Sequence, residues 1–516
     1  MNKKQTIIIL LSIITISLIF YIATVLKSES FWFDEVISLK IAEKPIIASW
    51  QYLKWENNPP LHYWYLHLWI KFFGSGEHAL RFSSVLTNIL SIIAIYILGK
   101  KISNKKTGLF AAFLISISCF QLTLATEARM YSLLTLFSIL SLLFYWEILN
   151  QPKDKKYNLT WILYSISTLA AYYTHLTALF LPIIQNIFFF YHARTEKINR
   201  KSNKIKYWLF TQMTIILLFA PWLITFAQKT LTKLNSEAWY LHTQGSGFFF
   251  AQIPKAFLFL GDKLPLIELI GLIIFGCIFL ASIIKIKKTS FPDREINIKL
   301  ITKPKIIFLI LIFIIPLILC FPIHLWVIKY YSISAIGFYI LLAIGFNNLN
   351  LKKHYRNILI IVIFAMLLPY NISKLKHDNQ HQWHQVAAYT QSIENKNDGI
   401  LISAFVYEII FNHYYQGDLN LIPTYPQSIA SDDILTRSIK YNWYPLKTKS
   451  DELSWQQQSE KYSRVIIVYP TKTSVIHQSN SFLNWLMDNN WKLIHQKKFN
   501  GLIEPQILVF KNPNIN

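Results

Sequence analysis

The sequence predicts a polytopic α-helical membrane protein with a small α/β domain at its C-terminal end. Apolar runs of about 20 residues, the length that crosses a bilayer, recur along the first part of the 516-residue chain. Lys and Arg cluster in every second loop between these runs. After residue 373 the composition becomes mixed polar and aromatic, without another run of that length. We therefore expect a transmembrane domain at residues 1–373 and an extracytoplasmic α/β domain at residues 374–516.

About eleven apolar runs predict membrane helices. No small-residue cleavage site follows the first run, so we expect a retained helix and not a signal peptide. The expected spans are residues 7–26, 79–99, 107–125, 131–149, 158–174, 176–191, 207–226, 266–284, 306–326, 330–346 and 357–373.

The formal net charge of +24 is explained by topology. Its clusters, such as Lys100–Lys106, Arg194–Lys206 and Lys285–Lys305, all fall in alternate loops. This is the positive-inside pattern, which places the N-terminus and the basic loops in the cytoplasm and the C-terminal domain outside. We therefore expect a multi-pass protein of the plasma (inner) membrane and no nucleic-acid partner.

Segments outside the membrane have their own predicted structure. In the first outer loop, residues 27–78, helical spacing of apolar residues predicts interfacial helices at Asp34–Trp55 and Pro60–Phe73. Asn57–Pro60 separates them because proline disfavours helix in the residue before it. Residues 227–265 are expected to form a long loop. In the C-terminal part we expect helices at Gln385–Glu394, Glu408–Tyr415 and Ser481–Asn489, and strands at Gly399–Ala404, Arg464–Tyr469, Trp491–Lys497 and Gln506–Phe510.

No metal site is expected from the cysteines, because all three fall far apart inside predicted spans. His377, His381 and His384, beside Asp378, have spacings that a transition metal accepts. The interpretation we favour is the polar start of a helix. We expect no required cofactor, and a divalent cation stays open.

The most informative residues are two carboxylates directly after the first span. Asp34 and Glu35 follow aromatic residues of the kind that mark the membrane interface. Carboxylates at this depth lose hydration, so they are candidates for catalysis. Glu127 and Arg129 arrive together between the third and fourth spans and can share a cavity with Asp34. The alternative is a structural ion pair at a helix turn.

Further polar residues fall at the same membrane level. Arg81 begins the second span, His175 follows the fifth, and Lys329 lies between the ninth and tenth. A cation near a span end often only reaches the headgroups. Together, however, these residues can form an anion site, which suits a phosphate leaving group.

The motifs occur in an order that resembles a known family. The chain resembles the bacterial GT-C membrane glycosyltransferases, with the protein O-mannosyltransferase-like glycosyltransferase family 39 as the nearest branch and the lipid A aminoarabinose transferases as relatives. The residues that carry the resemblance are Phe33–Glu35 with Ser38, Asn58–Trp64, Ala79–Phe82, Glu127–Tyr131 and Tyr173–His175.

This resemblance implies a GT-C fold and an inverting transfer of a sugar from a polyprenyl-monophosphate carrier to an acceptor at the outer membrane face. It implies that Asp34 is the catalytic base, with Glu35 the weaker candidate, and that Glu127 orients the acceptor or the sugar. Arg129 and Lys329 would compensate the departing phosphate. The remaining residues that it implies are Arg81 and Asn58 at the donor phosphate, and His62, Tyr63, Tyr131 and His175 in the substrate cavity.

Two departures from the family pattern matter. Relatives carry His before the double proline and Arg at the ninth-to-tenth turn, where this chain has Asn58 and Lys329. Lys329 keeps the charge but not the bidentate fork of arginine. Asn58 therefore keeps an inactive scaffold paralogue as an alternative. A transporter or flippase of lipid-linked sugars is another, because it also needs basic residues at membrane depth and many spans, although acidic residues clustered on the outer side favour the enzyme. The sugar is open, and so is the acceptor, which is a protein, a lipid or an envelope glycan.

Overall fold

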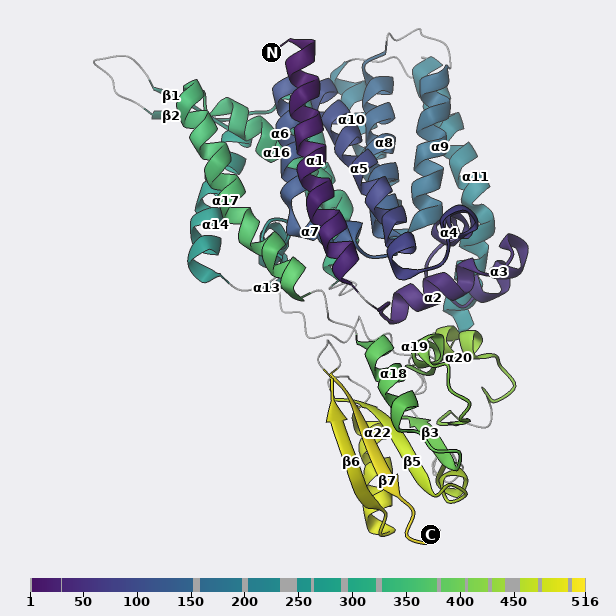
Figure 1. Cartoon of the computed structure of the whole chain (residues 1–516). Coiled ribbons are helices and arrows are strands. Elements are labelled where there is room, and N and C mark those ends of the chain that lie inside the picture. The colour runs from purple at the N-terminus through teal and green to yellow at the C-terminus, as the bar shows by residue number, and fades with distance from the viewer. Residues whose placement is uncertain are drawn as a thin grey trace.

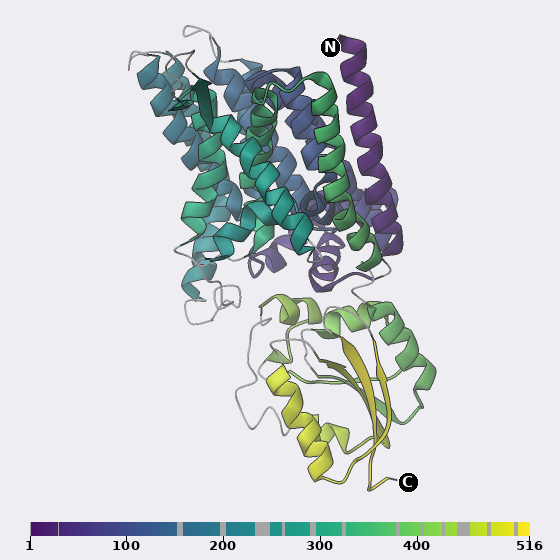
Figure 2. The same ribbon diagram turned by 90° about the vertical axis from the view of Figure 1, so that its left-hand side faces the viewer.

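The chain forms a helical bundle with a small sheet domain at one end (Figures 1 and 2). The N-terminus lies at the opposite end of the bundle (Figure 1). This arrangement confirms the predicted fold class. The computed structural model describes residues 2–28, 30–151, 158–196, 203–232, 248–260, 264–288, 296–321, 327–377, 382–403, 407–425, 429–440, 455–471, 476–499 and 504–515.

Within the described ranges, 8 helices are long and apolar enough to cross a membrane. Two other expected spans form shorter helices, α9 (Leu159–Thr174) with 16 residues and α15 (Pro304–Cys320) with 17. The 8 long helices are α1 (Lys3–Lys27), α5 (Glu77–Ile102), α8 (Tyr131–Leu149), η1 (Leu176–Leu179) with α10 (Phe180–Thr195), α11 (Asn203–Thr232), α14 (Pro265–Ile283), η2 (Ile328–Tyr331) with α16 (Ser332–Asn348), and α17 (Lys353–His377).

The expected span at residues 107–125 is not one straight helix. It consists of α6 (Lys105–Ile117) and α7 (Cys119–Ala125), which bend by 68° at a break. Buried Ser118 stands at the break, where its hydroxyl caps α7 by accepting from the backbone N–H of Gln121. A serine that offers the backbone a side-chain partner favours a helix start over a helix interior. The break leaves α7 ending just before Glu127.

Two loops contain structure that the sequence did not predict. The expected long loop at residues 227–265 holds the end of α11 and the helix α13 (Phe248–Ala256), and residues 233–247 lie outside the description. The basic loop after α14 holds the antiparallel strands β1 (Ile284–Lys288) and β2 (Ile296–Leu300). Isoleucines alternate with polar residues in both strands, and that period of two is a strand signal.

Three short helices lie between the bundle and the sheet domain (Figure 1). They are α2 (Phe33–Ala42), α3 (Ile46–Leu53) and α4 (Leu61–Phe73). The first expected interfacial helix is therefore two helices, because Pro45 adopts extended backbone and becomes the residue that precedes α3. Gly74 ends α4 with a φ of 84°, a conformation that suits glycine.

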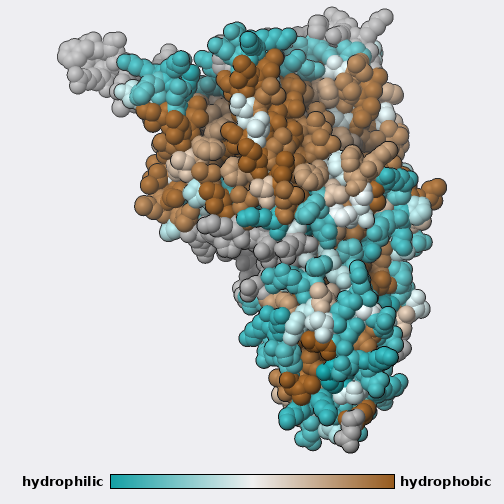
Figure 3. All heavy atoms as spheres, viewed as in Figure 1, coloured by the Kyte–Doolittle hydropathy of each residue, from teal (hydrophilic) through white to brown (hydrophobic). Residues whose placement is uncertain are grey.

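The surface of the bundle has the polarity of a membrane protein. Figure 3 shows apolar residues over the visible side of the bundle and polar residues over the sheet domain. Large apolar side chains of the bundle, such as Ile19 in α1 and Leu218 in α11, are more than half exposed. Exposed apolar surface of this extent has a favourable environment only in lipid. The multi-pass character predicted from the sequence is confirmed.

The sheet domain contains five strands in the order β4-β3-β5-β7-β6. The central strand β5 (Arg464–Pro470) pairs in parallel with β3 (Asp398–Ile402) and antiparallel with β7 (Pro505–Lys511). The edge strands are β4 (Leu421–Ile422) and β6 (Lys492–Lys498), and the helices are α18 (Trp383–Ile393), α19 (Glu408–Tyr414), α20 (Ile434–Lys440) and α22 (Ile476–Asp488). The elements β4 and α20 were not predicted.

The sheet domain contacts the short segment that leads into α2. The backbone N–H of Phe31 donates to the hydroxyl of Tyr414 at 2.6 Å, and that hydroxyl donates to Glu77 at 2.9 Å. The backbone N–H of His384 donates to the hydroxyl of Ser30 at 3.1 Å. Residues from three distant parts of the chain thus fix the backbone just before Asp34.

Candidate active site

Asp34 and Glu35 lie in the first turn of α2, where acidic residues complement the helix dipole. The Glu35 carboxylate accepts from the backbone N–H of Trp32 at 3.2 Å, which closes the start of the helix. Adjacent residues of a helix point in different directions. The two carboxylates consequently meet different partners.

Glu35 is fully buried in a closed network. It forms an ion pair with Arg81 at 2.7 Å and accepts from the backbone N–H of Ala128 at 2.8 Å. Burial opposes ionisation of Glu35, but Arg81 and these donors hold its pKa below the ordinary range. Arg81 also donates to the carbonyl oxygens of Ser28 and Ser30 at 2.9 and 2.8 Å.

This geometry argues against two of the predicted roles. The Glu35 carboxylate is enclosed by donors, so it is unsuited to take a proton from a substrate. The Arg81 guanidinium is 2% exposed and directed at protein oxygens, so it is unsuited to a donor phosphate. We assign this pair to holding the start of α2 against α5 and the turn before α8.

Asp34 is the accessible carboxylate of the two. Its side chain is 35% exposed and lies 3.5 Å from the guanidinium of Arg129. Arg129 also donates to the backbone oxygen of Asp34 at 2.9 Å and to the hydroxyl of Ser38 at 2.7 Å. Ser38 in turn donates to the same backbone oxygen. Arg129 therefore orients Asp34, and it does not form the predicted alternative ion pair with Glu127.

Burial raises the pKa of Asp34 above its ordinary value. Arg129 and Lys329 act in the opposite direction, while Glu56 and Glu127 add to the increase. A carboxylate with a raised pKa is a stronger base, which suits removal of a proton from a hydroxyl. Glu56 was not singled out in the sequence, although it lies directly before the Asn57–Pro60 break.

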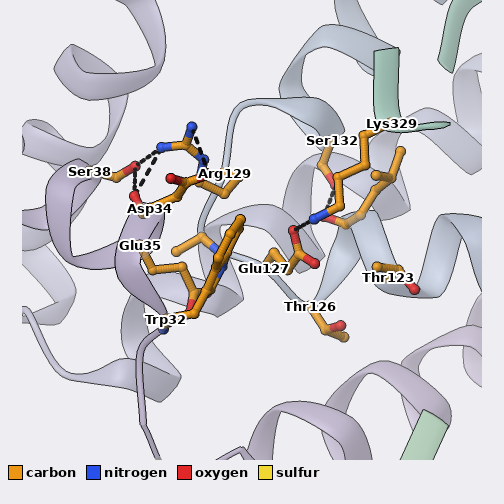
Figure 4. Close-up of polar contacts among 12 residues, drawn as sticks. Trp32, Asp34, Glu35, Ser38, Thr123, Thr126, Glu127, Arg129, Ser132 and Lys329 are labelled. Carbon is orange, nitrogen blue, oxygen red and sulfur yellow. Dashed lines mark hydrogen bonds and ion pairs between the residues drawn. The ribbon is translucent and has the colours of Figure 1, made fainter. Parts of the chain in front are cut away.

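A second ion pair joins Glu127 to Lys329 of η2 at 2.5 Å. The side chains are 17% and 25% exposed, so the pair remains accessible. The ammonium of Lys329 also lies 4.9 Å from the ring centre of Trp32 and 5.7 Å from that of Tyr131. Figure 4 shows the two ion pairs on either side of Trp32 in that view. The aromatic rings confine the lysine without removing its charge.

His62 and His175 are buried close to this cluster. The Nε2 atom of His62 lies 3.3 Å from the carbonyl oxygen of Ala128. His175 caps η1 by accepting from the backbone N–H of Thr177, and its ring lies 5.6 Å from that of Tyr131. Burial, reinforced by Arg129, lowers the pKa of each histidine to about 3. Both are therefore neutral at physiological pH.

The remaining predicted residues also lie around the cluster. The side-chain amide of Asn58 donates to the Glu56 carboxylate at 2.8 Å. The segment before α4 thereby holds Glu56, whose charge raises the pKa of Asp34. Tyr63 and Tyr131 are buried, with exposed fractions of 0% and 6%. Glu35 and Arg81 form a buried pair of their own. The other predicted residues lie together around the two ion pairs, namely Asp34, Glu127, Arg129, Lys329, Asn58, His62, Tyr63, Tyr131 and His175.

No group of three or more His, Cys, Asp or Glu side chains placed to hold a metal occurs in the described part of the chain. Of the histidines with metal-like spacing, His381 and the neighbouring Asp378 lie outside the described residues. His384 lies in α18, where its ring contacts that of Tyr414.

Two sequence comparisons match parts of the chain. Residues 57–225 match the family described as dolichyl-phosphate-mannose-protein mannosyltransferase. A protein of Aquifex aeolicus (strain VF5), described as uncharacterized, is 28% identical over 198 residues, which is 38% of this chain and 38% of that protein. The family match contains the α7–α8 turn with Glu127 and Arg129, and begins after Asp34.

Solved structures with similar folds extend over nearly the whole chain. ArnT from Cupriavidus metallidurans in the apo state aligns with a TM-score of 0.59 and 11% identity over 97% of each chain. The same protein bound to undecaprenyl phosphate gives 0.59 and 12% over 98% of each. The Archaeoglobus fulgidus oligosaccharyltransferase tethered with an acceptor peptide gives 0.52 and 13%, covering 100% of this chain and 75% of that one.

At these identities the structural likeness establishes the fold alone, and the family match concerns the sequence of residues 57–225, less than half of the chain. The chain is therefore related in sequence to the mannosyltransferase family over residues 57–225, and it shares the fold of ArnT and of the oligosaccharyltransferase.

Proposed function

We propose that this protein is an inverting glycosyltransferase that moves a sugar from a polyprenyl-monophosphate carrier to an acceptor hydroxyl. The observation that carries the proposal is the Asp34–Arg129 pair beside the Glu127–Lys329 pair, at one end of a GT-C bundle. One accessible carboxylate with a raised pKa and one accessible cation meet the two electrostatic needs of such a transfer. The structure of ArnT with undecaprenyl phosphate supports the class of donor.

In the proposed reaction the acceptor oxygen attacks the anomeric carbon from the side opposite the phosphate. Asp34 takes the hydroxyl proton as the new C–O bond forms. The bond between the anomeric carbon and the phosphate oxygen breaks, and the polyprenyl phosphate leaves with that electron pair. Arg129 keeps the Asp34 carboxylate in position, and Lys329 neutralises charge that develops on the phosphate.

Glu127 has a different place in this scheme. Its carboxylate holds the ammonium of Lys329 beside the Trp32 and Tyr131 rings, so that the cation is in position before the donor binds. A lysine ammonium is a point charge on a flexible side chain, so it depends more than an arginine guanidinium on a partner that holds it in position. Glu127 is thereby free to turn toward a sugar hydroxyl when the phosphate engages Lys329.

We further propose that the reaction takes place outside the cytoplasm. The site lies at the end of the bundle that carries the sheet domain, and the basic loops lie toward the other end (Figure 1). The positive-inside rule then directs the basic loops to the cytoplasm. The acceptor would be a protein, a lipid or an envelope glycan that reaches this face, and we propose that no metal is required.

The first experiment compares purified wild type with Asp34→Asn. Both are incubated with a panel of radiolabelled polyprenyl-phosphate sugars and a total membrane extract. We expect transfer by wild type and a loss of roughly 10³-fold or more in the variant, because the base is removed at constant volume. The matched control is Asp488→Asn, an exposed acid in α22. Retained transfer in Asp34→Asn overturns the assigned role, and binding of donors without consumption favours a transporter or scaffold.

A further inference from the structure

A cavity of about 400 Å³ lies between the interfacial helices and the sheet domain, apart from the ion pairs described above. One wall comes from the end of α2 and from α3, and the other comes from α19 and from the start of α20. Its volume is in the range of small-molecule sites. Its polar lining residues are Lys40, Lys44, Tyr52, Asn412, His413 and Asp433.

Of the two lysines that line the cavity, only Lys40 has an acidic partner among the described residues. Lys40 forms an ion pair with Glu43 at 3.2 Å, and both side chains are about one-third exposed. The ammonium of Lys44 lies 5.7 Å from the ring centre of Tyr52, and no ion pair joins it to an acid among the described residues. The charge of Lys44 is therefore available to a ligand.

The acid in the wall, Asp433, keeps its negative charge, but its oxygens are held by donors of its own segment. The Asp433 carboxylate accepts from the backbone N–H groups of Leu435 and Thr436 at 3.0 and 3.1 Å, and from the Thr436 hydroxyl at 2.8 Å. It is thus engaged as the cap of α20. His413 is neutral, because burial and the nearby Lys40 lower its pKa, although Glu77 and Glu43 act against this. It offers a hydrogen bond and no charge.

We propose that this cavity binds a phosphate-bearing group of the acceptor. Lys44, which has no acidic partner among the described residues, lies in the lining with the Glu43-paired Lys40, an amide and a neutral imidazole, and these donors suit a compact anion. Ile409, Ile434 and Leu435 provide an apolar floor for the carbon part of the ligand. Lys40 and Asp34 lie six residues apart on α2, which is ~9 Å along the helix axis. A phosphate held here anchors an acceptor whose hydroxyl reaches Asp34.

Phosphate binding can be tested without any transfer reaction. The full-length protein in dodecyl maltoside is treated with an amine-reactive acetylating reagent, and each lysine is quantified by mass spectrometry. We expect glycerol 3-phosphate, but not glycerol, to protect Lys44 and Lys40, while exposed Lys71 of α4 is acetylated equally throughout. In Lys44→Gln, protection of Lys40 should require roughly tenfold more glycerol 3-phosphate.

A parallel arm with phosphatidylglycerol or phosphatidylcholine in the micelles distinguishes the source of the phosphate. Protection by phosphatidylglycerol alone identifies a lipid headgroup, and protection by glycerol 3-phosphate identifies a soluble or exposed phosphate group. Both results support the site. Equal acetylation of Lys44 with and without both phosphates, or equal protection of Lys71, overturns it.

The assignment of this phosphate to the acceptor rests on the proposed function. In the transfer assay, Lys44→Gln should raise KM for the acceptor roughly tenfold and leave KM for the donor unchanged, with Lys71→Gln as the matched control. Wild type that protects Lys44 but transfers no sugar would contradict the proposed function and keep the phosphate site. Active wild type with an unchanged acceptor KM in Lys44→Gln would contradict the acceptor assignment alone.

Discussion

At the scale of single residues, Asp34 and Glu35 differ by one position but have opposite environments. Glu35 is enclosed by Arg81 and backbone donors, whereas Asp34 is one-third exposed beside Arg129. The sequence predicts that carboxylates at a membrane surface matter. It cannot predict which of the two faces a substrate, because Arg81 reaches α2 from α5 and Arg129 reaches it from the turn before α8. We therefore expect replacement of Glu35 to lower stability and replacement of Asp34 to lower activity.

Glu35→Gln should lower stability by about 3 kcal/mol, because it leaves the Arg81 guanidinium buried without a countercharge. The measurement is thermal unfolding in detergent. The matched control is Glu147→Gln, which breaks a more exposed ion pair with Lys101 and should cost about 0.5 kcal/mol or less. A Tm for Glu35→Gln equal to that of the control would show that the buried pair is dispensable for the fold.

The pH dependence of transfer should report the environment of Asp34. A general base must be ionised, so kcat/KM should fall as the pH drops through the raised pKa of Asp34. Glu56 raises this pKa, so Glu56→Gln should move the acid limb to lower pH. Arg129 lowers it, so Arg129→Gln should move the limb to higher pH. Shifts of both variants in one direction would contradict Asp34 as the titrating base.

At the scale of elements, the orientation of α2 depends on the segment that precedes it. Ser30 and Phe31 are held by Arg81 on one side and by the sheet domain on the other. Phe33 adds an edge-to-face ring contact with Tyr407. The sheet domain therefore holds the start of α2, and it also forms one wall of the cavity between α2 and α19. Such a role was not readable from the C-terminal sequence.

Tyr414→Phe tests this support, because it removes the hydroxyl that joins Phe31 to Glu77 and keeps the ring. We expect kcat to fall roughly tenfold through misplacement of Asp34, with KM for the donor unchanged. The control is Tyr415→Phe, which removes a hydrogen bond to Glu394 within the same domain. Equal kcat values for the two variants would exclude a positioning role for Tyr414.

At the scale of the whole molecule, hydropathy and charge predicted most of the architecture. Among the described residues every expected span is helical, as one helix or, at residues 107–125, as two, because lipid requires each crossing segment to satisfy its own backbone. The break at Ser118 was missed although its cap on Gln121 is local; the Ser118 hydroxyl also donates to the distant carbonyl oxygen of Phe257, a contact that the sequence does not show. The split at Pro45 had a visible local signal. The edge strand β4 is only two residues long, and so short a segment has too little sequence pattern to be predicted as a strand.

The orientation of the molecule in the membrane is the remaining prediction from charge. Because the sheet domain and the N-terminus lie at opposite ends of the bundle, a cysteine at Asp488 and a cysteine at Lys105 should be labelled from opposite sides. We expect a membrane-impermeant maleimide to reach Asp488→Cys from outside the cell and Lys105→Cys only in inverted vesicles.

The background for this experiment is Cys277→Ala, since Cys277 is exposed on the bundle while Cys119 and Cys320 are buried. Labelling of Lys105→Cys from outside would show that the protein has the opposite orientation in the membrane. The candidate active site would then face the cytoplasm, because α2 and the sheet domain lie at the same end of the bundle (Figure 1). That result would overturn the extracytoplasmic reaction and leave the roles of Asp34 and Lys329 intact.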